Sequence, residues 1–450
     1  MKGVAVSSEA APTIALDHVF HTWSSQRGLS QFKPSGAAGC WFWDRDGNRY
    51  LDFASQLVFT NLGHQHPALI GAIQEQASLL CTLAPDFGND TRSELATLIA
   101  ERAPGDLNYV FFTNGGTEAN EHAIRMARLH TGRQKILGTY RSYHGATGGS
   151  ITVTGDPRRW ANEPGIPGVV HFLGPYLYRS SFGAKTEEEE CRAALSHLRE
   201  VIELEGPATI AAIFLETIVG TNGVLIPPPG YLAGVRSLCD EFEIVMVCDE
   251  VMVGFGRIGE WFAVDAWGVT PDLITFAKGV NSGYVPLGGV IVSENIWGSF
   301  ADRVYPGGLT YSGHPLACAA GVASIRVFEE TNLLHQVRSL GREVAGPALL
   351  GLQQRHPSIG EVRGRGLFWA VELVRNRETR EMLVPYNASG TAKEPMVKLG
   401  AACRELGLWP FSHFNRIHVA PPLIISRAEL EDGIGRLDQA LGVADSYVEG

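Results

Sequence analysis

The sequence predicts an α/β protein in which a large domain with a mostly parallel sheet is joined to a smaller α+β domain. Apolar residues run without alternation through segments such as 244–248 and 273–277, which is typical of strands buried on both faces. Segments with helical spacing separate these runs, as in βαβ units. A second domain is expected because a chain of 450 residues is longer than one hydrophobic core usually supports.

Charge and cysteine usage exclude several classes of protein. The formal net charge of −11 disfavours a nucleic-acid partner, and no basic cluster offsets it. The seven cysteines are scattered and never form a CxxC pair, so we expect neither a disulfide framework nor a metal site. Residues 1–17 lack a signal-peptide pattern, and no apolar run is long enough to span a bilayer. We therefore expect a cytoplasmic protein without a membrane partner.

The chain is predicted to begin with an arm and a hairpin. Residues 1–35 are polar and mixed. Between residues 40 and 53, aromatic side chains flank the turn Asp46-Gly47, which is a strong hairpin signal. We assign residues 1–65 to this arm and to part of the smaller domain.

The large domain is expected over residues 66–330, where predicted helices and strands alternate. Helices are expected at 66–80, 91–102, 118–129, 187–204, 231–242 and 315–330, and strands at 109–112, 135–140, 210–216, 244–249, 273–277 and 288–293. From residue 331 the pattern changes to two long amphipathic helical stretches around a short strand pair within 362–374. We assign residues 331–450 to a C-terminal small domain.

Two of the buried strands end in a charge. Asp249 follows one apolar run and Lys278 follows another. Parallel sheets bind ligands beyond the carboxyl ends of their strands, so both side chains are expected at one cleft. Because buried charges need partners, these two form either a structural ion pair or the pair that pyridoxal 5′-phosphate requires, with Lys278 as its Schiff base and Asp249 on its ring nitrogen. Glu216 also ends a buried strand. It either forms a hydrogen bond within the site or caps the next loop.

Residues 114–117 (Asn-Gly-Gly-Thr) lie between a predicted strand and a predicted helix. N–H groups and the helix dipole bind anions at such a junction, and the Thr117 hydroxyl can add a bond. Many strand-to-helix turns use the same residues for geometry alone. The spacing matches neither a dinucleotide fingerprint nor a P-loop, which argues against NAD and ATP. The loop that contains Thr310 precedes another helix and is a second phosphate candidate.

The loop after the strand at 135–140 carries an aromatic residue that can stack on a planar ring. This residue is Tyr143, and His144 and Gly145 shape the loop beside it. Val251 lies two residues beyond Asp249 and therefore on the same side of an extended chain, where it can pack against the other face of the ring. An ordinary half-buried tyrosine and plain core packing of Val251 are the alternatives.

Together these motifs resemble the class III aminotransferases that depend on pyridoxal phosphate. They lie in family order, and the resemblance covers most of the chain. The motifs are Asn114-Gly115-Gly116-Thr117-Glu118-Ala119-Asn120-Glu121, Tyr143-His144-Gly145, Asp249-Glu250-Val251, Gly254-Phe255-Gly256-Arg257, Ala277-Lys278-Gly279 and Thr310-Tyr311-Ser312-Gly313-His314-Pro315. The last motif and residues 420–423 (Ala-Pro-Pro-Leu) are most similar to the omega-amino acid and amine:pyruvate branch, which includes taurine–pyruvate aminotransferases.

The resemblance implies a fold-type-I homodimer with active sites at the subunit interface. It implies that Lys278 holds the aldehyde of the cofactor and later acts as a general base, while Asp249 holds the pyridinium. It also implies that Gly115, Gly116 and Thr117 bind the phosphate, and that Thr310 reaches the phosphate of the neighbouring subunit's cofactor.

The remaining positions implied by the resemblance surround the ring and the substrate. The ring would lie between Tyr143 and Val251, with His144 and Glu216 also at the cofactor. Trp23 and Val58 lie roughly where relatives line the substrate pocket.

One position departs from the family. Many members carry an arginine for the substrate carboxylate shortly before the motif at 420–423, and here the matching residue is Phe411. Arg416 lies five residues later and can substitute only if the loop is rearranged; an exposed arginine beside a strand is its ordinary interpretation. Loss of a bidentate carboxylate partner favours apolar amines over acidic substrates. His413, Arg416 and the aromatic residues nevertheless leave other ways to hold an anion.

We therefore expect an aminotransferase that moves an amino group from an omega-amino acid or amine to pyruvate or a similar keto acid. Taurine–pyruvate transamination is one form of this activity. The same scaffold also supports a decarboxylase, which releases carbon dioxide, and an aminomutase, which needs no separate keto acid. A binding protein without catalysis is the remaining alternative, and the presence of Lys278, Asp249 and Tyr143 disfavours it.

Overall fold

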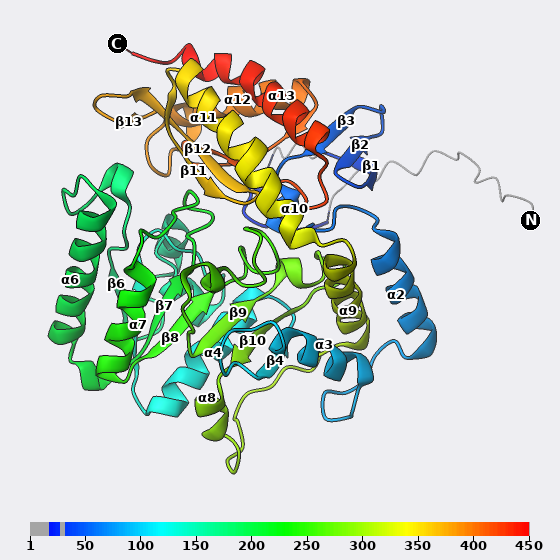
Figure 1. The fold of residues 1–450 in the computed structure, drawn as a ribbon, viewed down its shortest axis with the longest axis vertical. Coiled ribbons are helices and arrows are strands. Elements are labelled where there is room, and N and C mark those ends of the chain that lie inside the picture. Colours follow the sequence, from blue (N-terminus) through cyan, green and yellow to red (C-terminus); the bar gives the residue numbers. More distant parts are fainter. Residues whose placement is uncertain (1–17, 28–31, 450) are drawn as a thin grey trace, which may run out of the picture.

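The computed structural model describes residues 18–27 and 32–449, and its centre is a seven-stranded sheet (Figure 1). Neighbouring strands pair in parallel except at β10, which runs antiparallel to both β4 and β9. The mostly parallel sheet predicted from the sequence is thus confirmed. In spatial order the strands are β4 (Tyr109–Thr113), β10 (Gly288–Val292), β9 (Leu273–Phe276), β8 (Val245–Asp249), β7 (Ile210–Glu216), β5 (Lys135–Thr139) and β6 (Val169–Phe172).

Helices cover both faces of this sheet. Successive side chains of a strand point to opposite faces, so Val245 and Val247 of β8 pack against α4, whereas Met246 and Cys248 pack against the helices of the other face. Neither face of these strands meets solvent, which explains why their apolar runs do not alternate. One face carries α4 (Gly116–Thr131), α5 (Gly148–Val153) and α8 (Glu294–Gly298), and the other carries α3 (Asp90–Ala100), α6 (Glu187–Glu205), α7 (Tyr231–Phe242) and α9 (Pro315–Glu330).

Two smaller sheets lie on one side of the large sheet, in the upper part of Figure 1. The first consists of β1 (Pro34–Ala38), β2 (Trp41–Asp44), β3 (Arg49–Asp52) and β14 (Leu408–Trp409). The second consists of β11 (Ile359–Arg365), β12 (Phe368–Asn376), β16 (Arg416–Val419) and β15 (Phe411–His413), with β13 (Glu381–Met382) beside β12.

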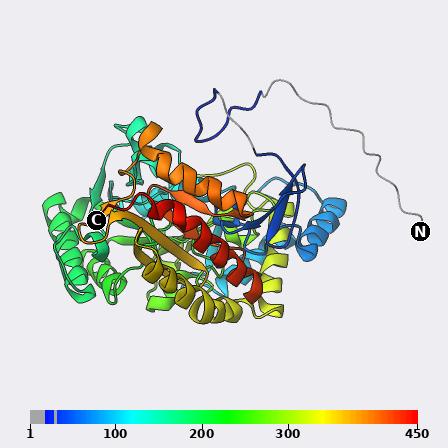
Figure 2. The ribbon, with the colours of Figure 1, turned by 90° about the horizontal axis from the view of Figure 1, so that it is seen from above.

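The helices of this part pack on the two smaller sheets. Figure 2 shows α12 and α13 side by side across one face of the molecule. A π-helical segment, Gly341–Ala345, joins α10 to α11. The helices are α10 (Leu333–Leu340), α11 (Gly346–Arg355), α12 (Glu394–Glu405) and α13 (Arg427–Asp445), and α1 (Ser55–Val58) and α2 (Pro67–Leu79) follow β3. Within the described ranges, no helix has both the length and the apolar character needed to cross a membrane.

The predicted hairpin is confirmed, but several short strands escape the sequence pattern. β2 and β3 pair antiparallel around the turn that holds Gly47 at a φ of 85°. The expected strand pair is the β11–β12 hairpin, and β16 and β15 extend its sheet. β14 has two residues and β15 has three, too few to show a period.

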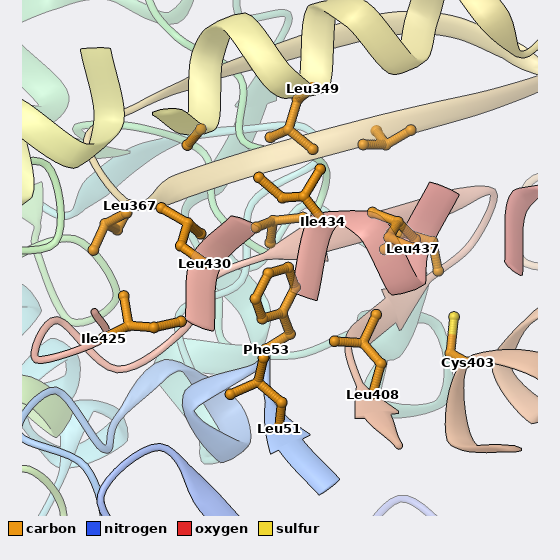
Figure 3. Packing of buried hydrophobic residues seen from close by; sticks show 14 of the residues in the cluster. Leu51, Phe53, Leu349, Leu367, Cys403, Leu408, Ile425, Leu430, Ile434 and Leu437 are labelled. Atoms are coloured by element: carbon orange, nitrogen blue, oxygen red, sulfur yellow. The ribbon is translucent and has the colours of Figure 1, made fainter. Parts of the chain in front are cut away.

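The two ends of the chain share one hydrophobic core. Leu51 of β3 pairs in parallel with Leu408 of β14. Phe53 follows β3, is fully buried, and points toward α13, where Leu430, Ile434 and Leu437 surround it (Figure 3). This contact fixes the N-terminal strands to the C-terminal helix.

Two glycines of α13 test how tightly this core is packed. A Cβ at Gly433 would collide with the Phe53 ring and lie 2.9 Å from Leu51 Cδ2, whereas a Cβ at Gly435 would meet no atom within 4 Å. We expect Gly433→Ala to lower the free energy of unfolding by about 1–3 kcal/mol because the core is overpacked. Gly435→Ala should raise it by up to about 1 kcal/mol through helix propensity. Urea unfolding measures both, and equal effects of the two substitutions would contradict the packing described.

Candidate active site

One cavity of about 840 Å³ lies beyond the carboxyl ends of β7, β8 and β9. Glu216, Asp249 and Lys278 enter it from the ends of these strands. The N-terminus of α4 and the loop after β5 form other parts of its wall. The structure therefore brings the charged strand ends into one cleft with the glycine turn and the aromatic loop.

Lys278 follows β9 in an uncommon backbone conformation. Its φ of 47° lies in the left-handed region, which lysine rarely adopts and which is often found at functional sites. Burial lowers the pKa of the amine to about 8, although the charges of Asp249 and Glu216 oppose this effect. The amine therefore loses its proton more readily than an ordinary lysine does, and its neutral form can act as a nucleophile or a base.

Asp249 is held by a network of buried polar groups. Its Oδ2 accepts a hydrogen bond from Asn120 Nδ2 at 2.8 Å and lies 2.7 Å from His144 Nδ1. Its Oδ1 accepts from the Val251 N–H at 2.9 Å. Asn120 is oriented in turn by the Thr275 hydroxyl, which donates to Asn120 Oδ1 at 2.7 Å. This network stabilises the carboxylate away from water and fixes its direction.

Glu216 ties the aromatic loop to the sheet. Its Oε1 accepts from the Tyr143 N–H at 2.9 Å and its Oε2 accepts from the Gly220 N–H at 2.8 Å. Burial raises the pKa of this carboxyl to about 7, and the neighbouring Asp249 adds to the shift. Glu216 thus fixes the backbone that carries Tyr143.

The glycine turn forms an anion cradle at the start of α4. The helix begins at Gly116, two residues earlier than predicted, so Gly116 and Thr117 belong to its first turn, where N–H groups lack helical partners. Gly115 is fully extended, with φ and ψ near 180°. A Cβ at Gly116 would lie 2.8 Å from the Val251 methyl groups, so only glycine fits there.

Arg158 is a cavity residue that sequence analysis missed. Its Cζ lies 3.5 Å from the centroid of the Tyr143 ring, and its Nε donates to Asp156 at 2.9 Å. Asn120 was missed as well, although it belongs to the quoted motif. Its signal is a polar residue on the buried face of α4, beside Ala119 and Ala123. For Arg158 the sequence offers no comparable signal.

The substrate residues predicted from the sequence fall into two groups. Trp23 and Phe411 line the cavity, and the Trp23 ring meets Tyr143 edge-on at 6.5 Å. Val58 does not line the cavity, which corrects the prediction. It is buried in an apolar cluster, and its neighbours Leu57 and Phe59 line the cavity instead.

The interpretation of Arg416 as an exposed arginine is wrong. Arg416 lies in β16 with no exposed surface, and its Nε is 3.4 Å from Glu372 Oε2 on the paired strand. It does not line the cavity. The partner lies 44 residues earlier in the chain, so the local sequence gives no sign of it. Thr310 is exposed and also lies outside the cavity of its own chain.

The cavity offers each partner that pyridoxal phosphate requires. Lys278 supplies an amine, Asp249 a fixed carboxylate suited to a ring nitrogen, and the turn at Gly116 the N–H groups of a helix start, close to Val251 and free of a Cβ. Tyr143 and Val251 also line this cavity, where a planar ring would need contacts on its faces. Among the described residues, no group of three or more His, Cys, Asp or Glu side chains is placed to hold a metal ion.

Comparisons with known proteins give a consistent result. The family model described as aminotransferase class-III matches residues 24–441. The taurine–pyruvate aminotransferase of Bilophila wadsworthia is 32% identical over 96% of this chain and 97% of its own. The putrescine–pyruvate aminotransferase of Pseudomonas aeruginosa is 33% identical over 88% of this chain and 87% of its own.

Solved structures agree with these sequence matches. A taurine:2-oxoglutarate aminotransferase from Bifidobacterium kashiwanohense, in complex with PLP and glutamate, is 44% identical with a TM-score of 0.92 and covers 95% of this chain and 96% of its own. An (S)-enantioselective omega-transaminase from Thermomicrobium roseum is 37% identical with a TM-score of 0.89, again over 95% and 96% of the two chains.

The burial of Lys278 predicts how its reactivity depends on pH. With a pKa of about 8, the neutral fraction of the amine should rise about tenfold between pH 7 and pH 9, against about a hundredfold for an ordinary lysine. Competitive acetylation of the apoprotein with acetic anhydride, read by mass spectrometry, measures this ratio. Exposed Lys398, whose pKa is raised by the hydrogen bond to Glu394, serves as the internal control. A hundredfold rise at Lys278 would show that its amine is not desolvated.

Proposed function

The chain belongs to the class-III aminotransferases, and we propose that it transfers the terminal amino group of an omega-amino acid or amine to pyruvate or a similar 2-keto acid. It is a transaminase that depends on pyridoxal phosphate. The observation that carries the proposal is the position of Lys278 and Asp249: they lie at the ends of adjacent strands and line the same cavity. The relatives named above act on taurine or putrescine, which supports the substrate class.

The chain's own residues supply the proton chemistry. When bound, pyridoxal phosphate contributes an aldehyde that takes up the amino group and a ring that withdraws electrons from the substrate carbon. Lys278, with its pKa of about 8, removes and returns the proton at that carbon. Asp249, fixed by Asn120 and His144, keeps a proton on the ring nitrogen. Tyr143 and Val251 hold the ring plane.

The apolar residues of the cavity support an amine that carries an alkyl segment. Leu57, Phe59, Trp23 and Phe411 give the cavity an apolar wall. The arginine with which many family members bind a substrate carboxylate is replaced by Phe411. The cavity therefore accepts an alkyl segment there more readily than an α-carboxylate.

We also propose that the protein is a homodimer whose active sites are shared. Thr310 and Tyr311 are exposed, as are the large apolar side chains of Leu79 and Phe87, which is typical of a protein–protein interface. Thr310 would then bind the cofactor phosphate of the other subunit. A cytoplasmic location is part of the same proposal, supported by seven free cysteines, of which six are buried.

The mechanism predicts the behaviour of a variant without the amine. Lys278→Ala should lose at least about 100-fold in turnover because the general base is removed. The measurement is keto-acid-dependent amine consumption, together with the change in visible absorption when taurine, β-alanine or a hydrophobic amine is added without keto acid. Lys398→Ala is the control for charge loss at the surface. Turnover that survives in Lys278→Ala would overturn the proposed mechanism.

The shared site predicts complementation between two inactive variants. Lys278→Ala lacks the amine, and Thr310→Asp should repel the phosphate and reduce the cofactor absorption of the purified protein. In a mixed dimer one site would receive both intact residues. Co-expression should then restore about a quarter of wild-type activity, since half of randomly formed dimers are mixed and each holds one intact site. A co-expressed mixture no more active than its parents would contradict a site shared through Thr310.

A further inference from the structure

A second cavity, of about 350 Å³, lies between α12 and β15, outside the active cavity. Sites for small molecules commonly have this size. Met396, Gly400 and Arg404 line it from one face of α12, because residues four apart lie on the same side of a helix. Ser412 and His413 line it from β15. We call this second cavity the α12 pocket.

The polar side chains of the α12 pocket are hydrogen-bond donors that remain unused. Lys393 and Arg404 carry its two charges, and no described Asp or Glu lines the pocket or forms an ion pair with either residue. The side chains of Asn387 and Ser412 form no hydrogen bond within the described part of the chain. His413 Nε2 is buried without a partner. Such a set of free donors suits an anionic ligand.

The electrostatic potential around His413 is positive. Burial lowers the pKa of its imidazole to about 3, and the charges of Arg158, Arg416 and Lys393 lower this pKa further. These charges lie close together although the chain has a formal net charge of −11. A negative charge placed in the α12 pocket would therefore be attracted by several cations at once.

The start of α12 adds to this potential. Lys393 is the N-cap residue of the helix, and no side chain caps the free N–H groups there. A cation at this position opposes the helix dipole, whereas an anion would be favoured. Glu394 of the first turn forms an ion pair with Lys398 and does not line the pocket. Helix stability thus explains Arg404, which lies in the last turn, but does not explain Lys393.

The two cations approach one region of the pocket. A Cβ at Gly400 would lie 3.5 Å from Arg404 Nη1, so the Arg404 side chain turns back over α12 toward the start of the helix. Lys393 lies seven residues before Gly400, which is about 10 Å along the axis of a helix. Two long side chains at this spacing can contact the same small ligand.

A single strand separates the α12 pocket from the active cavity. β15 is the edge strand of its sheet, and its side chains alternate between the two spaces. Phe411 lines the active cavity, Ser412 lines the α12 pocket, and His413 lines both. A ligand that contacts Ser412 and His413 would therefore restrict the movement of the strand that carries Phe411.

We propose that the α12 pocket is an effector site for a small dianion whose charges lie on oxygen atoms, and that the bound dianion fixes β15 and so tightens binding of the amino donor. A phosphate ester and a dicarboxylate share this chemistry. Lys393 and Arg404 contact the anionic oxygens, and Asn387 and Ser412 add hydrogen bonds. The binding site is independent of the proposed function, whereas the effect on the donor rests on it.

Titration calorimetry of the holoenzyme measures the binding, with glycerol 3-phosphate and malonate as probes of the two sources. Lys393→Gln and Arg404→Gln should each weaken binding about tenfold, the low end for a hydrogen bond to a charged group, because both side chains are exposed. Lys398→Gln is the matched control on the same helix, since Lys398 pairs with Glu394 and does not line the pocket. The probe that binds more tightly identifies the source.

A measurement on the unaltered holoenzyme avoids any dependence on the folding of a variant. Lys393 is exposed and can be acetylated by acetic anhydride, with mass spectrometry of the peptide as the readout. A saturating dianion should slow acetylation of Lys393 and leave that of Lys398 unchanged. Acetylation of Lys393 at the same rate with and without the dianion would overturn the site.

Steady-state kinetics test the effect on the donor. n-Butylamine is the donor because it has no anionic end with which the dianion could compete. A saturating dianion should lower its KM at least about fivefold, the low end of typical coupling between two sites, and leave kcat unchanged. In the variant that combines Lys393→Gln with Arg404→Gln, the dianion should have no effect on KM.

The outcomes separate this inference from the proposed function. Failure of both probes to bind, or binding that Lys393→Gln and Arg404→Gln leave unchanged, would overturn the site. Binding without a fall in KM, or with a rise in KM from competition in the active cavity, would overturn the effector role. A holoenzyme that turns over no donor with any keto acid would reject the proposed function, and calorimetry would still decide the site.

Discussion

The rest of the site depends on two opposite charges that are kept away from water at the ends of adjacent strands. Asp249 ends β8 and Lys278 follows β9, and strand pairing fixes their separation. Buried charges are tolerated only where polar groups compensate them. The Asp249 carboxylate is compensated by Asn120 and His144, and Asn120 is oriented by Thr275. The same desolvation lowers the pKa of the lysine. The apolar sheet is thus what gives the amine its reactivity.

The sheet and the cofactor side of the site could largely be predicted from the sequence, because each signal is local. The apolar run before Asp249 and the glycines at the start of α4 are contiguous in the chain. The partners of Asp249 could not be predicted, because Asn120 lies 129 residues away and no period connects them. Arg416 was misplaced for the same reason, since its burial depends on Glu372 of another strand. Strands as short as β14 leave no pattern at all.

The two halves of the cavity have different origins. The cofactor side is made by strand ends and by a helix terminus, which the sheet holds rigidly. Trp23, Arg158 and Phe411 also line the cavity, and they come from three separate parts of the chain outside the large sheet. Segments outside a central sheet vary more freely than the sheet itself. Relatives of this chain act on taurine and on putrescine, and such variation within one fold is consistent with this division.

The packing of Phe53 beneath α13 also has a consequence for biosynthesis. Leu51 pairs with Leu408, so the N-terminal strands leave the ribosome long before the strand that completes their sheet. At roughly 5–20 residues per second, this interval lasts on the order of 20–70 s. The large sheet lies entirely between these two segments and can form first. Meanwhile Phe42 and Phe53 lack their final partners, so aromatic surface of the nascent N-terminal segment stays uncovered until the C-terminal segment has been made.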